Sequence, residues 1–164
     1  MKTISSDRRF LASGALLLAV AMGVGRFVYT PLLPVMERDA GLTVGDAGTL
    51  ASSNLFGYLI GAGLAMAPFM HRRRLLVVRW AIVAVIATTA LMAADSTFWL
   101  LLRFVTGIGS ALVLVFASSI VLERAAHRNQ RSWPPLVFSG IGVGIAFSGI
   151  AVPVFVRMAG SRAA

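Results

Sequence analysis

The chain has 164 residues, of which 58% are hydrophobic and 13% are charged, and its mean hydropathy is +0.85. A water-soluble domain with this composition would lack the polar side chains that cover a soluble surface, so this class is excluded. The net charge of +9 does not indicate a nucleic-acid partner, because the basic residues stand mostly in short stretches between apolar runs. The absence of cysteine excludes disulfides within this chain.

Five apolar runs are each near the length of about 20 residues that a helix needs to cross a bilayer. Helices satisfy their backbone hydrogen bonds internally where water is absent, so we predict an all-α integral membrane protein. The predicted spans are 10–33, 47–70, 75–94, 98–122 and 134–156, with residues 1–9 as a cytoplasmic N-terminus and residues 157–164 as an extracytoplasmic tail or a truncation point.

The first span contains a charged residue, Arg26, in the segment "GVGRFVYTPLLP". Arg26 lies about 24 Å along a helix that begins at Phe10, which places it in the outer half of the membrane. The basic start followed by an apolar stretch also resembles a secretory signal. The apolar run continues to Leu33, however, so we expect a retained membrane span.

Polar and small side chains mark the second span. Asn54 and Tyr58 lie one turn apart and are candidates to face a solute path. The alternative, which we favour slightly, is that they join neighbouring helices by hydrogen bonds. Gly57 and Gly61 are four residues apart and would allow another helix to approach closely.

The loop after the second span is basic and contains Arg72, Arg73 and Arg74. Cytoplasmic loops carry an excess of Lys and Arg, so we predict a multi-pass protein of the cell (inner or plasma) membrane with a cytoplasmic N-terminus. The predicted cytoplasmic side holds nine basic residues, Lys2, Arg8, Arg9, Arg72, Arg73, Arg74, Arg124, Arg128 and Arg131, and the other side holds three, Arg38, Arg157 and Arg162.

The fourth span contains a second intramembrane arginine, Arg103. It lies about 7 to 8 Å along a helix that runs inward from residue 98, so its depth is comparable to that of Arg26. Two cations at one level, with no acidic residue inside any span, would form a site for an anion. Alternatively, each arginine snorkels to the headgroups, bonds to a backbone carbonyl, or is neutralised by Asp46 or Asp95 near the outer interface.

Small residues recur in the fourth and fifth spans and predict close helix packing. They are Gly107, Gly109 and Ala111 in the fourth span and Gly140, Gly144 and Gly149 in the fifth. No enzyme, metal site or cofactor is predicted. His71 and His127 lie in basic loops far from any paired carboxylate, and the chain has no phosphate-binding loop.

These small-residue motifs resemble those of the major facilitator superfamily of transporters. The matches to its motif B are Arg103, Gly107, Gly109 and Ala111, those to its motif C are Gly140, Gly144 and Gly149, and those to its motif A are Arg73 and Arg74 alone. In motif C, Ile145 replaces a proline and Ser148 replaces a glycine. The segments "GRFVYTPLLPVM", "GLTVGDAGTLASSNLFGYLIGA" and "FSGIGVGIAFSG" resemble the YbfB/YjiJ-type branch of this superfamily.

The resemblance implies secondary active transport of a small solute, for which the arginines favour an anion. Members have two six-helix halves around a central cavity, and helices one and four line that cavity. This chain would be the incomplete N-terminal half, and Arg26 and Arg103 would lie on the solute path.

The chain length implies a partner, because five spans lack even the sixth helix of one half and the site of such transporters lies between two repeats. The chain is therefore interpreted as a fragment of a longer transporter or a truncated gene product. The alternative is a truncated or non-transporting small membrane protein that serves as a packing partner or is a degraded gene product. The expected partners are the lipid bilayer, a small-molecule solute, and a missing C-terminal half or a second chain.

Overall fold

The computed structural model describes residues 2–92 and 98–160, and the regular elements of these residues are all helices. The all-α class that the sequence predicts is confirmed. In chain order the elements are α1 (Lys2–Leu18), the π-helix η1 (Ala19–Val24), α2 (Tyr29–Ala40), α3 (Val44–Ala65), α4 (Pro68–Arg72), α5 (Arg74–Leu91), α6 (Trp99–His127) and α7 (Trp133–Gly160). Asp95 and residues 161–164 of the predicted tail lie outside the described residues.

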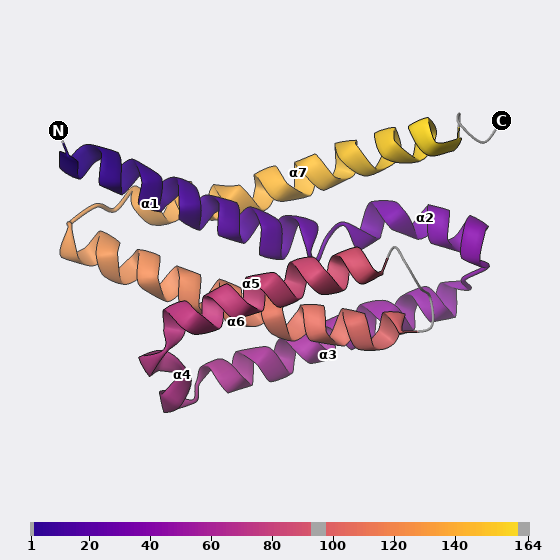
Figure 1. The fold of residues 1–164 in the computed structure, drawn as a ribbon, viewed down its shortest axis with the longest axis horizontal. Coiled ribbons are helices and arrows are strands. Elements are labelled where there is room, and N and C mark those ends of the chain that lie inside the picture. Colours follow the sequence, from indigo (N-terminus) through magenta and orange to yellow (C-terminus); the bar gives the residue numbers. More distant parts are fainter. Residues whose placement is uncertain (1, 93–97, 161–164) are drawn as a thin grey trace.

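Successive long helices run back and forth through an elongated bundle (Figure 1). The N-terminus of α1, the short α4 and the turn between α6 and α7 lie at one end, which we call the α4 end. The far end of α2, the start of α3 and the C-terminal end of α7 lie at the other end, which we call the α2 end. The basic loop and the N-terminus are thus gathered at one end of the bundle, as the predicted topology requires.

Four helical segments within the described residues are long and apolar enough to cross a membrane, namely Ser6–Arg38, Arg74–Leu91, Trp99–His127 and Trp133–Val156. The predicted span 47–70 is not among them. It forms α3 and α4, and the polar run from Ser52 to Asn54 lowers the hydropathy of α3. With 22 residues α3 is still about 33 Å long. It packs along α6, so part of its polar face meets another helix.

The helix ends differ from the predicted ends. The first predicted span stops at residue 33, but α2 continues through Pro34 and ends at Gly41, whose φ of 66° is the left-handed conformation that terminates helices. Similarly, α6 extends to His127 and α7 to Gly160. Helices in a membrane protein continue beyond the hydrocarbon, where the apolar pattern stops but backbone hydrogen bonding does not.

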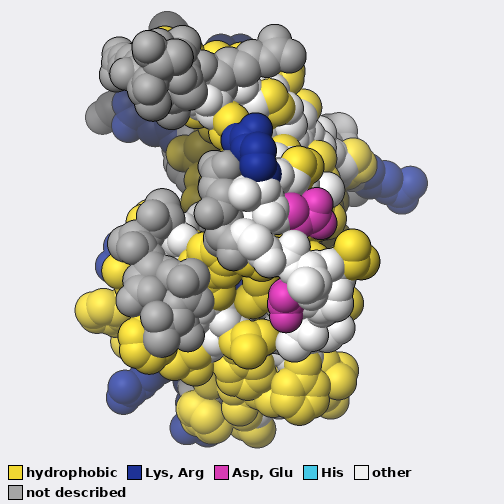
Figure 2. Space-filling view, turned by 90° about the vertical axis from the view of Figure 1, so that its right-hand side faces the viewer, with side chains coloured by type: hydrophobic (Ala, Val, Ile, Leu, Met, Phe, Trp, Pro, Cys, Tyr) yellow, Lys and Arg dark blue, Asp and Glu magenta, His cyan; other side chains and the backbone are white. Residues whose placement is uncertain are grey.

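The core lies around the middle of α6, where Val113 and Phe116 are fully buried. They pack in one cluster with Leu18 of α1 and Val137 of α7. Many large apolar side chains on the outer helix faces are exposed, which suits a lipid environment. Figure 2, which views the α2 end, shows hydrophobic side chains over much of the surface and few charged ones.

Candidate functional site

Arg26 lies at a break in the first membrane-crossing segment, between η1 and α2. Residues 19–24 form the π-helix, and residues 25–28 link it to α2 through irregular helical backbone, with Gly25 and Val28 both in the right-handed helical conformation. The amide of Phe27 donates to the carbonyl of Met22 over 3.3 Å, one residue further back than in an α-helix. Short π-helical segments of this kind occur frequently at functional sites.

Hydroxyl groups from two other helices bind the carbonyls of η1. Ser110 of α6 donates to the Ala21 carbonyl over 3.0 Å, and Ser148 of α7 donates to the Gly23 carbonyl over 3.1 Å. Both serines are buried. Backbone groups at this depth have no water to bind, so these hydroxyls stabilise the irregular segment that carries Arg26.

Arg103 is 4% exposed and lies beside the backbone of Arg26. Its Nη1 donates to the Arg26 carbonyl over 3.5 Å, which is long for a hydrogen bond. Its guanidinium carbon is 4.5 Å from the centroid of the Tyr29 ring. Its Nε is buried without a hydrogen-bond partner among the described residues. The structure therefore brings the two arginines together at a comparable depth.

The side chain of Arg26 faces α3. Its guanidinium carbon is 4.5 Å from the centroid of the Tyr58 ring and 5.8 Å from that of Phe27. Such cation–π contacts contribute about 0.5 to 2 kcal/mol, depending on how far water is excluded. Within the described ranges no carboxylate forms an ion pair with Arg26 or Arg103. Asp46, one of the partners considered from the sequence, instead caps its own helix.

Asn54 joins α3 to α6 directly at this site. It is 1% exposed, and its Nδ2 donates to the Arg103 carbonyl over 2.9 Å. The Tyr29 hydroxyl makes a similar bond to the Ala47 carbonyl of α3 over 3.1 Å. Asn54 thus forms the interhelical bond that the sequence analysis favoured, whereas Tyr58 contacts an arginine.

The sequence analysis missed Tyr29 and a buried pair of threonines. The hydroxyl oxygens of Thr88 in α5 and Thr106 in α6 are 2.7 Å apart. Thr106 follows Arg103 by three residues and Tyr29 follows Arg26 by three, so each polar group lies about one helical turn from an arginine. This spacing was the available signal, but it does not reveal that Tyr29 contacts Arg103.

A cavity of about 360 Å³ lies beside Arg103, between α2, the end of α5 and the start of α6. Its walls include Tyr29, Leu32 and Trp99. The indole of Trp99 donates to the Met92 carbonyl over 2.9 Å, which closes the gap between α5 and α6. This arrangement places one cationic group at the side of a mostly apolar space, whose other polar side chains are Tyr29 and Thr89.

The predicted packing glycines lie mostly at three helix interfaces, those of α6 with α3, of α6 with α5, and of α7 with the segment formed by α1 and η1. In α6, a Cβ atom at Gly107 would meet the Asn54 carbonyl of α3, and one at Gly109 would meet side-chain and backbone atoms of α5. In α7, a Cβ atom at Gly140 would meet the Ala15 carbonyl, and one at Gly144 would meet the Ala19 carbonyl. Ala111 is fully buried. A Cβ at Gly149 would meet nothing within 4 Å, so this residue lies on an open helix face.

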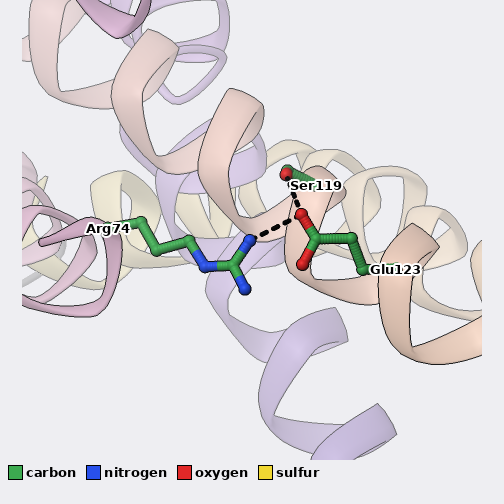
Figure 3. Close-up of polar contacts among 3 residues, drawn as sticks. All are labelled: Arg74, Ser119 and Glu123. Atoms are coloured by element: carbon green, nitrogen blue, oxygen red, sulfur yellow. Dashed lines mark hydrogen bonds and ion pairs between the residues drawn. The ribbon is translucent and has the colours of Figure 1, made fainter. Parts of the chain in front are cut away.

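The basic loop is attached to α6 at the α4 end of the bundle (Figure 3). Glu123 accepts hydrogen bonds from Arg74 over 2.6 Å and from Ser119 over 3.1 Å. The next residue, Arg124, pairs with Asp7 of α1 at 3.0 Å. The other two arginines of the loop are exposed. Adjacent residues of α6 therefore bind α5 and α1 at the end predicted to be cytoplasmic.

Comparison with known proteins agrees with a membrane transporter. A chloramphenicol resistance protein of Streptomyces lividans is 46% identical over 54 residues, which make up 31% of this chain and 14% of that protein. The match thus spans about a seventh of the relative's length. No solved structure matches the chain. A family model described as an uncharacterised MFS-type transporter, YbfB, matches residues 18–164. The chain is therefore a multi-pass membrane protein that belongs to this family of major facilitator-type transporters.

Proposed function

We propose that this chain forms part of a secondary active transporter that moves a small solute across the cell (inner or plasma) membrane. Arg26 and Arg103 lie on the solute path in this proposal, and the N-terminus is cytoplasmic. The observation that carries it is Arg26 at the irregular segment between η1 and α2, with the buried Arg103 of α6 bonded to its carbonyl. Membership of a transporter family supports transport as the class of activity.

The energetics of the two cations favour a functional role. An arginine in the middle of a membrane helix costs about 2.5 to 3.5 kcal/mol in insertion measurements. Two arginines in the outer half of the membrane therefore cost at most about 5 to 7 kcal/mol before compensation. The described residues offer aromatic rings and one long bond to a carbonyl, which offset part of this cost. Attraction of an anionic solute to the two arginines would account for the rest of this free-energy cost.

A second half is needed to complete the path, because such sites lie between two repeats. We propose that this half comes from the same polypeptide or from a second chain. The exposed apolar side chains of α3, Leu55, Phe56 and Leu59, are available to lipid or to this partner.

The transport test compares cells that express the chain together with its second half, as one polypeptide or as two chains, with cells that carry an empty vector. Chloramphenicol is the first solute, because a relative is named for resistance to it, and a panel of small organic anions is tested next. We expect a change in accumulation of labelled solute that an uncoupler abolishes and that Arg26→Ala removes. Arg128→Ala, in the exposed turn after α6, is the matched control and should behave as the unmodified chain.

Two results would count against this proposal. If Arg26→Ala reaches the membrane in normal amounts and moves the solute equally well, Arg26 is not on the path. If no solute moves while the chain and its second half are both stable in the membrane, the proposed function is wrong and the chain is a non-transporting membrane protein that packs against a partner.

The proposed orientation is tested with single cysteines, since the chain has none. Val44→Cys at the start of α3 and Gln130→Cys in the turn between α6 and α7 are exposed positions at opposite ends of the bundle. A membrane-impermeant maleimide added to whole cells should label Val44→Cys alone. Labelling of Gln130→Cys alone would place the N-terminus outside.

A further inference from the structure

The cavity between α2, α5 and α6 combines apolar walls with one incompletely bonded cation. Val28, Leu32, Met92 and Trp99 contribute apolar surface to its lining, and Arg103 contributes the charge. At about 360 Å³ it is within the size range of small-molecule sites. It is separate from the Arg26–Tyr58 contact, which faces α3.

The hydrogen-bonding capacity of Arg103 is poorly used by the described residues. Its Nε has no partner there, and the bond from its Nη1 to the Arg26 carbonyl is 3.5 Å long. A buried donor that lacks its acceptor is costly, and a buried cation more so. The planar guanidinium group offers parallel N–H donors that fit the two oxygens of a carboxylate or phosphate. Because Arg103 lines the cavity, an anion bound there would offer such an acceptor to its guanidinium group.

We propose that this cavity binds an amphipathic organic anion, with its anionic group on Arg103 and its apolar body against α2 and Trp99. A cavity of about 150 Å³ holds benzene, so the space here suits an acid of about two fused rings. The proposal rests on the proposed function, because it names the class of solute. The same chemistry is offered by a free acid and by the headgroup phosphate of a lipid, and the test separates these sources.

The probe is 2-naphthoate, with the neutral 2-naphthamide as its matched control. The full chain is placed in nanodiscs of phosphatidylcholine, and binding is measured by equilibrium dialysis. We expect saturable binding of the naphthoate and binding of the amide at least about tenfold weaker, which corresponds to one charge-assisted hydrogen bond. Equal binding of the two probes, or no saturable binding, would overturn the proposal.

Two variants test the location of the probe. Arg103→Gln should weaken naphthoate binding to the level of the amide. Because this change can also disturb folding, Leu32→Trp fills the cavity without removing the charge, and Leu33→Trp, next to it on α2 but outside the cavity lining, is the control. Loss of binding in Leu32→Trp alone supports the site, whereas equal binding in both tryptophan variants would overturn it.

Phosphatidylglycerol in the nanodisc distinguishes the two sources of the anion. If this anionic lipid weakens naphthoate binding, the site takes a lipid phosphate, and if it has no effect, the site takes a free acid. Naphthoate binding to a chain that moves no solute would refute the proposed function but leave the site in place. Transport that depends on Arg26, without saturable naphthoate binding, would refute the site but leave the proposed function in place.

Discussion

Replacement of Gly107 by alanine should force α3 and α6 apart and destabilise the fold. A Cβ atom at Gly107 would meet the Asn54 carbonyl, and a Cβ atom at Gly57 would meet the Phe104 carbonyl, so the two backbones touch from both sides. The atoms in the way are backbone atoms of packed helices and cannot rotate aside as a flexible side chain could. A gap of about 0.5 to 1 Å between the helices would forfeit a quarter to a half of each contact energy.

The expected loss is about 1 to 3 kcal/mol, the usual range for an overpacked core. Gly63→Ala in α3 is the matched control, because a Cβ atom there would meet nothing within 4 Å. Both changes gain the same helix propensity of up to about 1 kcal/mol, so the difference between them isolates the packing effect. The assay is unfolding of the purified chain in mixed micelles by increasing SDS, followed by circular dichroism. Equal midpoints for the two variants would refute the close approach of α3 and α6.

Three further predictions concern other contacts. Ser148→Ala removes a hydroxyl that binds η1 and should cost about 0.6 kcal/mol, the mean for interhelical bonds in a membrane; an unchanged SDS midpoint would contradict this. Hydrogen bonds from the Thr43 side chain and backbone hold the pKa of the Asp46 carboxyl below its usual value. The first turn of α3 should therefore be fully stabilised above the ordinary Asp pKa. It should fray as the pH falls through the lowered pKa that Asp46 has in the folded chain. Amide exchange between about pH 6 and pH 2 measures this fraying, and Thr43→Val should shift it to higher pH. The Arg74 and Glu123 side chains are 33% and 48% exposed, so water screens their ion pair and Glu123→Gln should leave the SDS unfolding midpoint nearly unchanged; a large fall in that midpoint would contradict this.

The helices and the relative depth of the arginines could be predicted from the sequence. Apolar runs of spanning length leave helices as the simplest way to satisfy the backbone in lipid, and a constant rise per residue converts positions into depths. This arithmetic placed Arg26 and Arg103 at a comparable depth, and the structure adds that the Arg103 side chain bonds to the carbonyl of Arg26. A hydropathy average along α3 is lowered by polar residues such as Asn54. In the structure the Asn54 side chain bonds to the Arg103 carbonyl of α6, which compensates for burying it, and an average over one helix does not include this bond.

The directions of the two arginine side chains could not be predicted, because they depend on several helices at once. The π-helical turn before Arg26 is stabilised by Ser110 and Ser148, which are distant in sequence. A π-helical turn contains an extra residue, so the segment C-terminal to it is rotated relative to its position in an ideal helix. Gly149 illustrates the same limit, since a motif position alone does not show that its helix face is open.

Arg26 and Arg103 direct their guanidinium groups to different parts of the molecule, and one hydrogen bond connects them. Arg26 contacts Tyr58 of α3, whereas Arg103 contacts Tyr29 and lines the cavity. The Arg103 Nη1 also donates to the carbonyl of Arg26, in the turn that separates η1 from α2. A carboxylate in the cavity would compete with this carbonyl for the same donor, and a bond of 3.5 Å is weak enough to be displaced. Occupancy of the cavity by a carboxylate would then remove the one hydrogen bond that joins the Arg103 side chain to the backbone of Arg26 among the described residues.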